Sequence, residues 1–171
     1  MFMKRAVYYG LVKVGNMKQA ILVLSFGTPR QPSDLLPYLT SIRRGKVPTE
    51  RELVALTLRY DAIGQWDNVT LQTMGEQQKQ ILENLLGIDS IYLAYLHMPN
   101  SMEHTVADIV AAGYTSILTI VTSPFYSQVG TGSYERKLQS ILQAYPNISY
   151  ESIQSWWDTP QFFAYWCSQL K

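Results

Sequence analysis

Cysteine and uncompensated charge are both scarce in this chain of 171 residues, and each scarcity excludes a class of protein. The single cysteine, Cys167, excludes an internal disulfide and a cysteine-held iron–sulfur cluster, and it fits the reducing environment of the cytoplasm. A net charge of +1 argues against a dedicated nucleic-acid binder, because neutralising phosphates needs a clear cationic excess. No apolar run approaches the roughly 20 residues that span a bilayer.

Recognisable catalytic motifs are also missing. The two histidines, His97 and His104, have no His or Glu partner at metal-binding spacing, so the residues predict no metal site. His97 is more typical of a structural or hydrogen-bonding histidine. No glycine fingerprint supports nicotinamide or flavin binding, and no Ser–His–Asp set or paired-carboxylate motif is evident. The residues therefore predict no catalytic group and no resident cofactor.

The length suits one domain with a real core. Residues 1–16 are basic and tyrosine-rich, without the apolar stretch and cleavage site of a signal peptide. We expect them to be a leader extension, with Met17 as the natural start; a short edge strand at Val7–Val14 is the alternative. Residues 17–171 are then predicted to form the domain.

Four short apolar runs alternate with helical patterns, which predicts βαβ units and a parallel sheet. The expected fold is α/β: a single doubly wound lobe with a four-stranded parallel sheet flanked by helices. Ligands of such sheets bind outside the carboxyl ends of the strands, so the loops after the first three strands should line one rim. The predicted strands are Ala20–Leu24, Ser90–Tyr95, Ile117–Val121 and Ile148–Ile153, and the loops are Ser25–Pro29, Leu96–Pro99 and Ser123–Tyr126.

Helix signals lie between the strands. Thr49 and Glu52 have the spacing of a capping box, and Gly45 and Gly113 are expected to end helices. Two helices have apolar residues at helical spacing, which predicts a buried face on each. These residues are Met74, Ile81, Leu82 and Leu85 in a helix from about Leu71, and Phe163, Trp166 and Leu170 in a helix from Pro160.

An ordered set of segments resembles the N-terminal half of the bacterial ferrochelatases, and the likeness extends from Met17 to Lys171. The segments are Ser25-Phe26-Gly27-Thr28-Pro29, Ile42-Arg43-Arg44-Gly45, Arg59-Tyr60-Asp61-Ala62-Ile63-Gly64, Ser123-Pro124-Phe125-Tyr126-Ser127 and Gly132-Ser133-Tyr134. The resemblance implies a chelatase-like lobe and the insertion of ferrous iron into coproporphyrin III or protoporphyrin IX in cytoplasmic haem biosynthesis. Iron is then a substrate, and no cofactor is implied.

The family's metal-handling histidine and later acidic residue lie in a second lobe, beyond the segments matched here. Activity would need that lobe from a separate chain or from a second copy of this one. The alternative is a truncated, inactive remnant that at most binds porphyrin, and an unrelated small-ligand α/β module is a third, weaker hypothesis.

The resemblance implies five substrate-binding residues, each with a structural alternative. Phe26 would stack on the macrocycle, where the family usually has Tyr, or would belong to the core. Arg43 would bind a propionate or complement the helix dipole, and Arg44 shares both possibilities. Arg59 and Tyr60 would lie at the substrate rim or form a structural salt bridge. Tyr134 would touch the porphyrin edge or pack on the sheet.

Two segments affect this prediction. Asp67 stands where the family has a serine facing substrate, and a carboxylate there would repel a propionate. The aromatic residues of the tail from Ser155 to Trp166 are expected to be core rather than ligand contacts.

Overall fold

The computed structural model describes residues 18–64, 66 and 70–170, and the predicted leader and Asp67 lie outside the described residues. Four parallel strands form the sheet, in the order β2-β1-β3-β4. Their bounds are β1 (Gln19–Ser25), β2 (Ile91–Tyr95), β3 (Ser116–Val121) and β4 (Ser149–Ile153). The predicted four-stranded parallel sheet is confirmed, and each strand lies within a few residues of its expected position.

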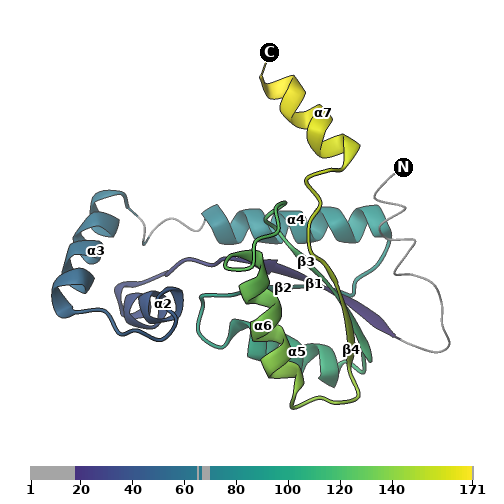
Figure 1. Ribbon diagram of the computed structural model, residues 1–171, viewed down its shortest axis with the longest axis horizontal. Coiled ribbons are helices and arrows are strands. Elements are labelled where there is room, and N and C mark those ends of the chain that lie inside the picture. Colours follow the sequence, from purple (N-terminus) through teal and green to yellow (C-terminus); the bar gives the residue numbers. More distant parts are fainter. Residues whose placement is uncertain (1–17, 65, 67–69, 171) are drawn as a thin grey trace.

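The central strand β1 is apolar on both faces because helices cover both sides of it. Leu22 and Leu24 face α5 (Ser101–Ala111) and α6 (Thr131–Leu142), where Met102, Ile109 and Leu138 complete the larger core. Ile21 and Val23 face the opposite side, where α4 (Thr70–Leu86) packs through Leu82 and Leu86. Figure 1 shows α4 on one side of the sheet and α5 with α6 on the other.

Two smaller helices precede α4 in the chain. A short 3-10 turn (Pro32–Asp34) leads into α2 (Leu35–Ile42), and α3 (Glu50–Ala62) follows. The predicted capping box is confirmed: Glu52 N donates to Thr49 Oγ1 and Thr49 N donates to the Glu52 carboxylate. In Figure 1, α2 and α3 extend beyond the β1 end of the sheet. They therefore flank the rim where the strands end.

The apolar face predicted for α4 is only partly correct. Leu82 packs on the sheet, but Met74, Ile81 and Leu85 are exposed, at 50%, 56% and 68%. The stripe beside it is buried instead, because Gly75 brings the helix against β2: a Cβ there would lie 2.8 Å from Leu93 Cδ2. The period of the pattern was correct, but the close approach at glycine selects which stripe faces the sheet.

The prediction that the tail aromatics form core is wrong for the last helix. None of the residues of α7 (Pro160–Gln169) is buried, and Phe163 is 71% exposed. Figure 1 shows α7 projecting away from the sheet and the other helices, so no described element covers its aromatic side chains. Only the start of the tail is anchored, where Trp156 Nε1 donates to the Val121 carbonyl over 3.0 Å.

Candidate functional site

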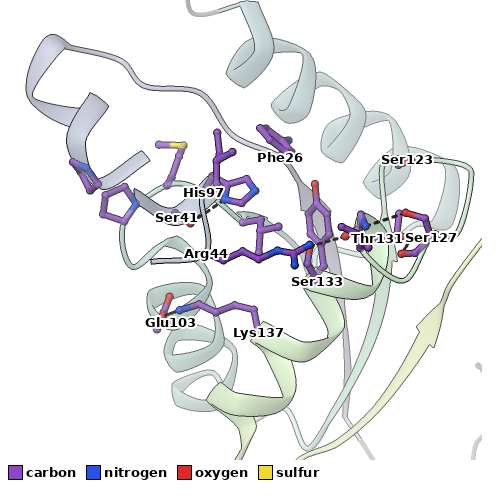
Figure 2. Close-up of a pocket in the computed structure, with 18 of the residues that line it drawn as sticks. Phe26, Ser41, Arg44, His97, Glu103, Ser123, Ser127, Thr131, Ser133 and Lys137 are labelled. Atoms are coloured by element: carbon purple, nitrogen blue, oxygen red, sulfur yellow. Dashed lines mark hydrogen bonds and ion pairs between the residues drawn. The ribbon is translucent and has the colours of Figure 1, made fainter. Parts of the chain in front are cut away.

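The loops after β1, β2 and β3 line one pocket at the carboxyl rim of the sheet, as the strand pattern predicts. Its volume is about 780 Å³, and its lining is more apolar than polar. The end of α2 and the start of α6 close its sides (Figure 2). This size lies within the range of about 300–1,000 Å³ that is usual for small-molecule sites.

The loop after β1 is held close to the loop after β2. His97 N donates to the Phe26 carbonyl over 3.0 Å, and Gly27 has a φ of +89°. A Cβ at Gly27 would lie 2.9 Å from Met98 Cγ and 3.0 Å from Tyr95 Cβ. Glycine at this position thus permits both the turn and the contact. As a result Phe26, which is 44% exposed, presents its ring to the pocket instead of the core.

His97 contacts Phe26 edge to face, with ring centroids 4.4 Å apart. Its Nδ1 is 2.9 Å from Ser41 Oγ, which joins the β2 loop to α2. Burial lowers the pKa of His97 below its ordinary value, so the imidazole is neutral near pH 7. The hydrogen-bonding histidine expected from the sequence is therefore present, and it lines the pocket.

The loop after β3 is fixed by its own side chains before α6 begins. Ser127 N donates to Thr131 Oγ1 over 2.8 Å, and Gly130 N donates to Ser127 Oγ over 2.9 Å. Tyr134 follows on the first turn of α6, buried in the larger core and also lining the pocket. Burial raises the pKa of Tyr134 to about 12, so its phenol stays protonated. Both roles weighed for Tyr134 are thus compatible.

Arg43 does not line the pocket. Its guanidinium forms a two-pronged ion pair with Glu52, with both N–O distances 2.8 Å. That ion pair and the bonds from Thr49 lower the pKa of Glu52 to about 2. The Glu52 carboxylate therefore serves both the helix cap and Arg43, and a ligand carboxylate would have to displace it from Arg43.

Arg59 and Tyr60 also lie outside the pocket lining. Arg59 is exposed near the end of α3, while Tyr60 contacts the Trp66 ring at 5.4 Å. Burial first, and then the neighbouring Tyr60 hydroxyl, raises the pKa of Tyr38 to about 12. Tyr38 contacts Phe26 and His97 in turn, at 6.4 and 6.3 Å. Tyr60 thus reaches the pocket only through Tyr38.

Sequence reasoning missed an ion pair in the pocket. Lys137 on α6 pairs with Glu103 on α5, and both line the cavity (Figure 2). The residues are 34 positions apart and belong to no motif, so no sequence signal could have joined them. Ser41 was missed for the same reason, since His97 is 56 positions away from it.

The described residues contain no group of three or more His, Cys, Asp or Glu side chains that could hold a metal ion. Within the same part of the chain, no helix has the length and apolar character needed to cross a membrane.

Comparison with known proteins places this geometry in a family. A ferrochelatase family model matches residues 18–171. The chain is 34% identical to a coproporphyrin III ferrochelatase from Bacillus pumilus over 90% of its own length and 51% of the relative's. Coproporphyrin III ferrochelatases from Bacillus subtilis and Staphylococcus epidermidis are 32% and 34% identical, over 92% and 88% of this chain. The chain spans about half the length of these curated relatives, and it belongs to the ferrochelatase family.

Proposed function

We propose that the rim pocket binds a porphyrin, and that the protein takes part in inserting ferrous iron into it. Coproporphyrin III is the preferred candidate, because the relatives are named for it. The observation that carries the proposal is the half-apolar pocket of about 780 Å³ where three strand ends meet in a chain of this family. Iron is a substrate of this reaction, and haem biosynthesis is its context.

Within the pocket, Phe26 and Tyr134 are the proposed macrocycle contacts. The Phe26 ring is accessible and can stack on a planar tetrapyrrole, although a phenyl group can neither ligate iron nor donate a hydrogen bond. The protonated Tyr134 hydroxyl can donate one. The assignment of Arg43, Arg59 and Tyr60 to the ligand stays a prediction, and their positions outside the lining do not favour it.

A second lobe is proposed to supply the groups that receive the metal. This rests on the relatives, which are about twice as long as the matched segment. The apolar side chains left exposed on α4 and α7 are consistent with a covering partner, because aromatic helices seldom face water. The partner would be a separate chain or a second copy of this one.

An anaerobic absorbance assay tests the reaction. Purified chain is mixed with coproporphyrin III, ferrous iron is added, and the free-base Q bands are followed against a protein-free control. Insertion faster than the control supports the proposal, and a rate that rises more steeply than chain concentration indicates that a second copy completes the site. A shifted Soret band without faster insertion would favour the alternative function, that of a porphyrin-binding remnant.

A further inference from the structure

Three of the charged side chains in the described structure line the pocket, and two of them neutralise each other. Glu103 and Lys137 form an ion pair, which leaves Arg44 as the remaining charge of the lining. His97 is neutral near pH 7 because burial lowers its pKa, and burial keeps the Tyr134 phenol protonated by raising its pKa. The lining therefore has one net positive charge, which comes from Arg44.

Arg44 is free to bind. Its side chain is exposed, and its guanidinium has no hydrogen bond or ion pair with any residue that the structure describes. Figure 2 shows it extending along the pocket toward Ser133 and Thr131 on α6. Arg43 is in the opposite condition, with its two-pronged bond to Glu52 outside the lining. Of the two adjacent arginines, only Arg44 offers an unoccupied guanidinium fork to the cavity.

The backbone at Arg44 is also unusual. Arg44 N donates to the Ser41 carbonyl and Gly45 N donates to the Thr40 carbonyl, at 3.1 and 2.8 Å. These bonds end α2 in a motif whose first residue past the cap adopts a left-handed conformation, usually as glycine. Arg44 adopts it with a φ of +56°. Helices α3, α4 and α5 instead end with glycine in this conformation, at Gly64, Gly87 and Gly113.

We propose that Arg44 is the residue that selects a carboxylate-bearing ligand in this pocket, and that Arg43 is a structural residue held by Glu52. The inference rests on the proposed function, because it assigns the contact for a propionate side chain of the porphyrin. A planar guanidinium suits a carboxylate, because two parallel N–H groups can donate to its two oxygens. A side chain kept in a conformation that favours glycine is a sign of a functional requirement.

Three glutamine variants of the full chain test the assignment by absorbance titration with coproporphyrin III, whose four carboxylates make it the probe. Arg44→Gln should weaken binding about tenfold, the loss expected for one charge-assisted contact. Arg44→Lys, which keeps the charge but not the fork, should restore part of the affinity. Arg51→Gln is the matched control, since Arg51 is another exposed arginine without a described partner, and it should bind like wild type.

Arg44→Gly adds a readout that a structural role would not produce. Glycine tolerates the left-handed conformation, so the thermal midpoint should stay the same or rise while affinity falls. Arg43→Gln should do the reverse: it leaves Glu52 unpaired and lowers the midpoint, with affinity unchanged. Loss of binding in Arg43→Gln with wild-type binding in Arg44→Gln would overturn the inference and leave the proposed function standing. Absence of binding by the wild-type chain would overturn both.

Discussion

Replacing Gly27 by alanine should destabilise the protein strongly, because two independent costs coincide at this residue. A left-handed φ of +89° costs a residue with a Cβ about 1–2 kcal/mol. The new Cβ would also lie 2.9 Å from Met98 Cγ and 3.0 Å from Tyr95 Cβ. Met98 can move aside, but Tyr95 Cβ is fixed at the end of β2, and overpacking of this kind costs about 1–3 kcal/mol.

The sum is about 2–5 kcal/mol, which for a chain of this size lowers the thermal midpoint by roughly 5–15 °C. Circular dichroism during heating and urea unfolding both measure it. Gly45→Ala is the matched control, since Gly45 has the same φ of +89° but no atom within 4 Å of the added Cβ. Its loss should be limited to the backbone cost of about 1–2 kcal/mol. Equal losses in the two variants would refute the claim that close packing at Gly27 holds the rim together.

Two further changes probe the rim histidine and the exposed helix face. Because burial lowers the pKa of His97 below its ordinary 6.5, the unfolded chain binds more protons as pH falls, so the free energy of unfolding should fall with pH. His97→Gln should flatten this dependence in urea unfolding between about pH 7.5 and about pH 5.5, and an unchanged slope would contradict it. Changing both Ile81 and Leu85 to Lys, at exposed positions on α4, should alter the free energy of unfolding by no more than about 0.5 kcal/mol per site and should reduce any self-association seen by sedimentation. A large loss of stability would show that this face is buried after all.

The strands and the rim could be predicted from the sequence because both depend on local order. Short apolar runs separated by helical patterns specify parallel strands, and parallel strands bring the loops around Phe26, His97 and Ser123 to one edge. The Thr49 capping box was predictable for the same reason, since its partner lies three residues away.

Contacts between distant residues could not be predicted in this way. The spacing of Met74, Ile81 and Leu85 gave a helical period, but the approach of Gly75 to Leu93 decides which stripe is buried. The aromatic residues of α7 suggested core, but burial also requires a covering surface, and no described element provides one. The paired arginines at positions 43 and 44 looked alike in sequence, and only the structure shows Glu52 occupying the first.

The central claim is that the rim pocket is the porphyrin site, and a titration of coproporphyrin III into two valine-to-tryptophan variants tests it most directly. Val129 lines the pocket and Val54 lies on α3 outside it, while both are exposed, at 65% and 53%, so tryptophan should fill the pocket only in the first variant. The account predicts a saturable Soret shift with the wild-type chain and with Val54→Trp, and its loss with Val129→Trp. No shift with the wild type, or an equal shift in all three proteins, would contradict it.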